Sequence, residues 1–127
     1  MRFKGFTVIE LLVVLAAVGL LLAVAAPRYV QHLDAAREVA LKEDLRAMRD
    51  AIDKFYGDQG RYPGALEELV TKRYLRSVPV DPLTGSASTW KIVAPGNGSV
   101  APEAAGVFDV RSGAAGQARD GSQYAAW

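Results

Sequence analysis

Glu10 is the residue whose chemistry and position most need an explanation in this chain. It is the only charged side chain in the apolar run of residues 6–26, which follows a short basic segment with Arg2 and Lys4 that ends at Gly5. An α-helix of this length spans about 30 Å, the hydrocarbon thickness of a bilayer. A carboxylate in such a segment costs on the order of 2.5–3.5 kcal/mol on insertion scales, which indicates a functional reason for it. A cationic partner would offset that cost.

The other ionisable and nucleophilic residues do not form a pattern typical of a catalytic site. His32 is the only histidine, cysteine is absent, and Glu67 and Glu68 are adjacent. Adjacent residues lie about 100° apart around a helix, so these two carboxylates do not form a catalytic pair. No glycine-rich phosphate loop follows a predicted strand, and a net charge of +1 without a basic stripe gives no basis for nucleic-acid binding. We therefore predict that the protein is not an enzyme and binds no nucleic acid.

The element that positions Glu10 is predicted to be one long helix over residues 6–56. Pro27 is predicted to break or bend it, because proline removes a backbone donor and clashes with the preceding turn. Beyond Pro27, apolar residues recur at spacings of four and three and face the opposite side from many charged residues. These apolar residues are Leu41, Leu45, Met48, Ile52 and Phe55. We expect the helix to be apolar all round in its first half and amphipathic in its second, and Gly57 and Gly60 to end it.

The remaining residues are predicted to form a small head of α+β class. Helical spacing of leucine and valine predicts a short helix over residues 65–75. Residues 90–93 and 107–110 have the composition of strands and are expected to pair antiparallel, with residues 95–106 as the connecting loop. With no cysteine in the chain, the head has no disulfide to brace it.

The start of the chain carries a family resemblance. The stretch KGFTVIELLVVLAAVGLL, residues 4–22, resembles the N-terminal signature of type IV pilins and of the related pseudopilins of type II secretion. Later stretches, GRYPGALEELV, YLRSVPVDPLTGS and GVFDVRSG…DG…Y…W, are similar to the major pseudopilins. The resemblance implies a type IV pilin-like fold with three parts. Residues 1–5 would be a leader cleaved between Gly5 and Phe6, residues 6–26 a transmembrane and assembly helix, and residues 27–127 a periplasmic domain. Prepilin peptidase would also methylate the new amino group of Phe6.

The same resemblance implies a function and a set of partners. The protein would be a structural subunit of a periplasmic pseudopilus that drives type II secretion, a homopolymer built by packing of N-terminal helices. Glu10 would pair with the Phe6 amine of the neighbouring subunit. Partners would be the prepilin peptidase, the inner-membrane assembly platform with its ATPase, minor pseudopilins, and membrane lipid before assembly. The chain would cross the bacterial inner membrane once, with a cytoplasmic N-terminus and a periplasmic head.

Other readings of the same residues remain open. A cleaved secretory signal also combines a basic start with an apolar stretch, and Ala23-Val24-Ala25 resembles its small-residue cleavage site. A plain membrane anchor accounts for the length of the run but leaves Glu10 unexplained. A subunit of an extracellular type IV pilus and a membrane-anchored binding module that never polymerises are the alternative functions.

The resemblance further implies one bound calcium ion in the C-terminal tail. Asp109, Ser112 and Asp120 are the candidate ligands, with Ser122 as a further one, because calcium takes six to eight oxygen ligands. The family often has an acidic residue where this chain has Ala115. The alternative is that both aspartates only stabilise turns by accepting hydrogen bonds from nearby backbone amides.

Overall fold

The computed structural model describes residues 5–96 and 106–127 of the chain. Most of the predicted basic leader and of the predicted loop over residues 95–106 lies outside these described residues. The chain divides into two compact units, Met1–Ala35 and Ala36–Trp127.

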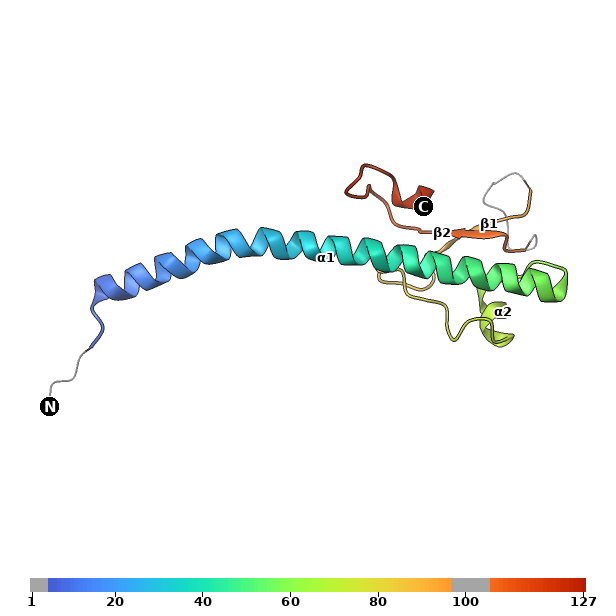
Figure 1. The fold of residues 1–127 in the computed structure, drawn as a ribbon, viewed down its shortest axis with the longest axis horizontal. Helices are drawn as coiled ribbons and strands as arrows, with labels where there is room; N and C mark the ends of the chain where they lie inside the picture. The colour runs from blue at the N-terminus through green and yellow to red at the C-terminus, as the bar shows by residue number, and fades with distance from the viewer. Residues whose placement is uncertain (1–4, 97–105) are drawn as a thin grey trace. The chain divides into compact units, whose positions relative to one another are not determined.

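The long predicted helix is present as α1, Val8–Gln59 (Figure 1). The predicted break at Pro27 is wrong, because the helix passes through this residue without interruption. Proline removes only one backbone donor, and strong helix formers such as alanine and leucine on both sides supply the neighbouring hydrogen bonds. Gly57 also lies inside the helix, and the end comes at Gly60, which has a φ of 70° and donates its N–H to the carbonyl of Tyr56 at 2.9 Å. This left-handed conformation favours glycine just beyond a helix.

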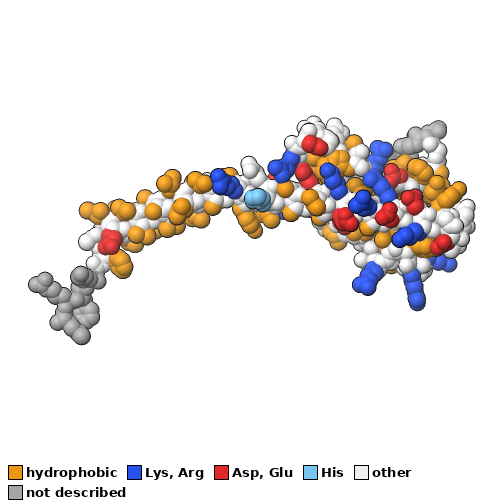
Figure 2. Space-filling view, viewed as in Figure 1, with side chains coloured by type: hydrophobic (Ala, Val, Ile, Leu, Met, Phe, Trp, Pro, Cys, Tyr) orange, Lys and Arg blue, Asp and Glu red, His pale blue; other side chains and the backbone are white. Residues whose placement is uncertain are grey.

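In the first unit, α1 presents apolar side chains all round its axis. Every residue from 5 to 34 is exposed, and Figure 2 shows hydrophobic side chains covering this half of the helix. Among the described residues, α1 is the helix long and apolar enough to cross a membrane. A helix that is apolar on every face requires a partner, which is either lipid or other protein surfaces.

In the second unit, the amphipathic part of α1 supplies most of the core, as predicted. The exposed fractions of Leu41, Leu45, Met48, Ile52 and Phe55 are all 1% or less. Burial of each such side chain stabilises the fold by roughly 1.5–3 kcal/mol. The residues that pack against this stripe come from later in the chain: Leu66, Leu69, Trp90, Val107 and Val110.

The predicted short helix is present as α2, Leu66–Thr71, and is shorter than the expected residues 65–75. Arg73 adopts a φ of 66°, which a continuing helix does not allow, and the N–H groups of Tyr74 and Leu75 both donate to the carbonyl of Leu69. The chain therefore turns back at Arg73, while Leu75 still packs against the core.

The predicted antiparallel strand pair is confirmed, with small shifts in its bounds. Strand β1, Lys91–Val93, pairs with β2, Asp109–Arg111, and Ile92 lies opposite Val110. In Figure 1 this sheet and the C-terminal tail lie on one side of α1, and α2 lies on the other. A short 3₁₀ helix, η2, Tyr124–Ala126, closes the chain. The architecture is the expected α+β class of type IV pilin-like proteins.

Candidate functional site: the N-terminal segment and the C-terminal tail

Glu10 lies in the first turn of α1, where Thr7 caps the helix. The N–H of Glu10 donates to Oγ1 of Thr7 at 3.1 Å, and the N–H of Leu11 donates to the carbonyl of Thr7 at 3.1 Å. Threonine at the cap with glutamate three residues later is the sequence of a capping box. The positive end of the helix dipole also favours a carboxylate at this position. Thr7 therefore satisfies the backbone N–H of Glu10 and holds this residue in the first turn of the helix.

The predicted processing and assembly residues are all accessible from outside the chain. Phe6 is 85% exposed, and Gly5 and Glu10 are exposed as well. A Cβ atom built on Gly5 would meet no heavy atom within 4 Å. An enzyme or a second subunit can therefore reach the Gly5–Phe6 bond and the carboxylate of Glu10 without displacing any other described part of the chain.

The three predicted calcium ligands are bound to three different partners. Oδ1 of Asp109 accepts hydrogen bonds from Nε of Arg49 and from its neighbour's backbone N–H, both at 2.7 Å. Ser112 is completely buried and donates to Asp81 at 2.6 Å. Oδ1 of Asp120 accepts hydrogen bonds from the N–H of Ser122 at 2.9 Å and from its hydroxyl at 2.5 Å.

This donor set does not fit a calcium ion. Calcium needs six to eight oxygens converging at 2.3–2.6 Å. Within the described ranges, no group of three or more histidine, cysteine, aspartate or glutamate side chains is arranged to hold a metal. The hydroxyl of Ser112 donates its hydrogen bond to the buried carboxylate of Asp81. The carboxylate of Asp109 is already paired with the positively charged guanidinium of Arg49. Both carboxylates do accept hydrogen bonds from nearby backbone amides, as the alternative interpretation expected.

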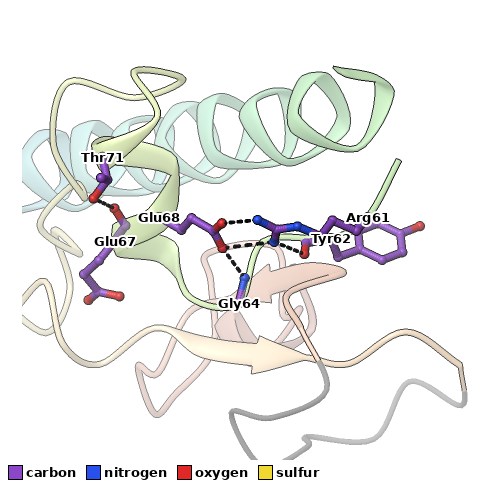
Figure 3. Close-up of polar contacts among 6 residues, drawn as sticks. All are labelled: Arg61, Tyr62, Gly64, Glu67, Glu68 and Thr71. Carbon is purple, nitrogen blue, oxygen red and sulfur yellow. Dashed lines mark hydrogen bonds and ion pairs between the residues drawn. The ribbon is translucent and has the colours of Figure 1, made fainter. Parts of the chain in front are cut away.

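Glu67 and Glu68, which are adjacent in the sequence, make different contacts in the structure. The carboxylate of Glu68 binds Nη2 of Arg61 at 2.5 Å and the N–H of Gly64 at 2.6 Å (Figure 3). The hydrogen bonds from Arg61 and Gly64 hold the pKa of Glu68 below its ordinary range. The main-chain carbonyl of Glu67 accepts a hydrogen bond from the hydroxyl of Thr71 at 3.0 Å. This cluster fastens the turn before α2.

Sequence reasoning missed two residues that organise the head, Arg49 and Asp81. Arg49 is one of several cations on the polar side of α1, but it follows the core residue Met48 and reaches three acceptors. Asp81 is completely buried, and Oδ1 accepts the N–H of Leu83 at 2.8 Å. The stretch DPLTG was a signal for Asp81, because aspartate before proline often starts a turn.

Comparison with known proteins agrees with these features. A family model for the prokaryotic N-terminal methylation motif matches residues 1–26. The type II secretion system core protein G of Pseudomonas aeruginosa is 32% identical over 109 residues, which cover 73% of this chain and 75% of that protein. The core protein G of Klebsiella michiganensis is 29% identical over 109 residues with the same coverage.

Pilins are also similar, but over less of their length. The type IV major pilin protein PilA of Myxococcus xanthus is 32% identical over 68 residues, 54% of this chain and 31% of that protein. No solved structure matches the chain. The similarity to core protein G extends beyond the N-terminal motif into the head, and the chain belongs to the family of the type II secretion system core protein G.

Proposed function

We propose that this protein is a structural subunit of a periplasmic pseudopilus that drives type II protein secretion. The observation that carries the proposal is similarity to core protein G over 73% of the chain, combined with a methylation motif over residues 1–26. The similarity to a type IV pilin covers 31% of that pilin, so the pseudopilus is favoured over an extracellular pilus. The role is mechanical, and no enzymatic activity is part of it.

Processing would precede assembly. Prepilin peptidase cleaves between Gly5 and Phe6 and methylates the amino group of Phe6, so the leader of residues 1–5 is lost. The subunit then spans the inner membrane through residues 6–26, with its N-terminus in the cytoplasm and the domain of residues 27–127 in the periplasm. The exposure of Phe6 and the apolar surface of α1 on every side support this order of events.

Assembly moves the apolar helix from lipid into a filament of identical helices. Leucine, valine and alanine side chains suit both surroundings, since lipid and protein interiors are similarly apolar. Glu10 pairs with the Phe6 amine of the neighbouring subunit, which offsets the cost of burying its charge in the filament. The membrane platform with its ATPase and the minor pseudopilins are the remaining partners of this process.

The first test is intact-mass spectrometry of the full chain purified from membranes that contain its peptidase. A chain that begins at N-methylated Phe6 supports the proposal. A chain that retains Met1 would make the protein a simple anchor, and one that begins near Ala26 would make residues 1–25 a secretory signal. Either of these outcomes contradicts the proposal.

The second test separates membrane insertion from polymerisation. Glu10→Ala should still insert into the membrane but form no filaments, measured by membrane fractionation and electron microscopy. Asp53→Ala, which removes an exposed carboxylate from the second half of the same helix, is the matched control and should assemble normally. Normal filaments from Glu10→Ala would refute the pairing, and filaments found only on the cell surface would favour the extracellular pilus.

A further inference from the structure

Arg49 binds the C-terminal part of the head at three points. Its Nε donates to Oδ1 of Asp109 at 2.7 Å, and its Nη2 donates to the main-chain oxygens of Val110 at 3.0 Å and Trp127 at 2.7 Å. The side chains of Arg49 and Asp109 are 37% and 28% exposed, so water screens this pair less than a fully exposed one. A planar guanidinium reaches several acceptors at once, which the single ammonium of lysine does not.

Glu38 and Lys42, which precede Arg49 in α1, also contact the C-terminal tail. Oε1 of Glu38 accepts the N–H of Arg119 at 2.9 Å and the hydroxyl of Tyr124 at 3.1 Å. Nζ of Lys42 lies 4.5 Å from the centre of the Trp127 ring, within the range of a cation–π interaction. Glu38 and Lys42 are one helical turn apart and Arg49 follows two turns later, so all three lie along one side of α1.

The tail also closes on itself through its own polar groups. Asp120 accepts hydrogen bonds from the backbone N–H and the hydroxyl of Ser122. Oγ of Ser122 in turn accepts a hydrogen bond from Nε1 of Trp127 at 2.7 Å. The N–H of Ala118 donates to the carbonyl of Ser122 at 2.6 Å. These bonds form a compact turn that presents Trp127 to Arg49 and Lys42.

The carboxylates that the resemblance assigns to calcium are each engaged by a group of the protein instead. Asp109 is paired with Arg49. Oδ1 of Asp120 is taken up by the N–H and the hydroxyl of Ser122. A divalent cation placed at Asp109 would be repelled by the guanidinium of Arg49. The position that often carries the additional acid in the family is Ala115, which has no oxygen to offer.

We infer that Arg49, with Glu38 and Lys42, takes the place of a metal ion in this protein and fastens the C-terminal tail to α1 without calcium. The inference concerns the head and does not depend on the proposed function. If these side chains fasten the tail, neither the stability of the head nor the protection of the tail amides from hydrogen exchange should depend on the calcium concentration.

The metal side of the inference is tested on the full chain in detergent micelles. Thermal unfolding is followed by circular dichroism in excess EGTA and in about 10 mM CaCl₂, which exceeds the dissociation constants of the weakest extracellular calcium sites. The expected result is the same Tm in both solutions. A calcium-dependent rise in Tm, or stoichiometric calcium binding in titration calorimetry, would overturn the inference.

The clamp side is tested by hydrogen exchange of the tail amides. Arg49→Gln should increase the exchange rate of residues 117–127 by about tenfold, because the charge-assisted hydrogen bond to the main-chain oxygen of Trp127 is lost and each 1.4 kcal/mol corresponds to a factor of ten. Arg49→Lys should fall between this variant and the wild type. Arg46→Gln, at an exposed arginine of the same helix, is the matched control and should leave the tail unchanged.

A milder variant keeps the test decisive if Arg49→Gln fails to fold. Glu38→Gln keeps the length of the side chain and weakens only its bonds to Arg119 and Tyr124. It should speed exchange in the tail while leaving the amides of β1 and β2 protected. Unchanged tail exchange in Glu38→Gln, and in Arg49→Gln where that variant folds, would show that these side chains do not hold the tail and would overturn the inference.

Discussion

Ser112 donates a hydrogen bond of 2.6 Å to Oδ2 of Asp81, and both residues are completely buried although they are 31 positions apart in the chain. The other oxygen of Asp81 accepts the N–H of Leu83 at 2.8 Å, and Oγ of Ser112 accepts the N–H of Ala114 at 3.1 Å. The pair therefore joins the turn after α2 to the segment that follows β2. In a small head without disulfides, this buried contact fixes two irregular segments relative to each other.

Removing either partner of this pair should destabilise the head strongly. Asp81→Ala leaves the Ser112 hydroxyl and a turn amide without their acceptor, and Ser112→Ala leaves a buried carboxylate one donor short. Each substitution should lower the free energy of unfolding by about 1–3 kcal/mol, with Asp81→Ala the larger. Urea unfolding in detergent micelles measures this loss.

A double variant tests whether Asp81 and Ser112 stabilise the head through their contact with each other or independently. Asp81→Ala with Ser112→Ala should cost less than the sum of the single variants, because the second substitution removes a group already left unpaired. Ser88→Ala, at an exposed serine, is the control and should stay within about 0.5 kcal/mol of the wild type. Additive effects of the two single substitutions would contradict a direct coupling between them.

Gly113 cannot be replaced without moving the backbone of a neighbouring segment. A Cβ atom built on it would lie 2.0 Å from the carbonyl oxygen of Thr89. Gly113→Ala should therefore lower the free energy of unfolding by about 1–3 kcal/mol, the usual cost of overpacking. Gly57 makes a matched comparison, because it lies within α1 with open space around it, and Gly57→Ala should stabilise by roughly 0.5–1 kcal/mol. Equal unfolding midpoints for the two variants would contradict this assignment.

Glu68 should give the head a pH-dependent contribution to stability. Its pKa in the folded state is lowered, mainly by Arg61 and then by the N–H of Gly64. A lowered folded-state pKa stabilises the fold above the ordinary pKa of glutamate, and this stabilisation is lost as pH falls through the folded-state value. Glu68→Gln should therefore lower Tm at neutral pH. The difference from wild type should vanish in acid, which thermal unfolding across a pH series measures. A difference independent of pH would show that packing, and not charge, is responsible.

Asp44 should change the stability of the head with pH in the opposite direction to Glu68. Burial raises its pKa, and the negative charges of Asp81 and Glu43 raise it further. The folded state then holds this proton more tightly than the unfolded state, so stability falls as pH rises from the ordinary pKa of aspartate through the raised one. Asp44→Asn should raise Tm at neutral pH and have little effect in acid. The exposed Asp53→Asn is the control, and a neutral-pH Tm below that of wild type in Asp44→Asn would contradict the prediction.

The elements of this fold could largely be predicted from the sequence because their signals are local and periodic. The stripe from Leu41 to Phe55 repeats at helical spacing, and all five of its predicted members are buried. The composition of residues 90–93 and 107–110 predicted both strands, and the predicted bounds differ from those of β1 and β2 by at most two residues. Single residues that usually end or interrupt a helix were less informative than these repeating patterns. Pro27 and Gly57 are tolerated inside α1, and Arg73 ends α2 early.

By itself, the sequence determined the membrane-length apolar run, the place of Glu10 within it, and the amphipathic half of the helix, because each depends on residue type and spacing along one element. The tertiary structure alone decided which charges meet. Arg49 is one of several arginines on the polar side of α1, and nothing in its neighbours in sequence shows that Asp109 and Trp127 come within hydrogen-bonding distance of it. Such contacts depend on how segments 60 to 78 residues apart in the sequence are folded together. An interaction between two single charges so far apart along the chain produces no repeating pattern from which it could be predicted.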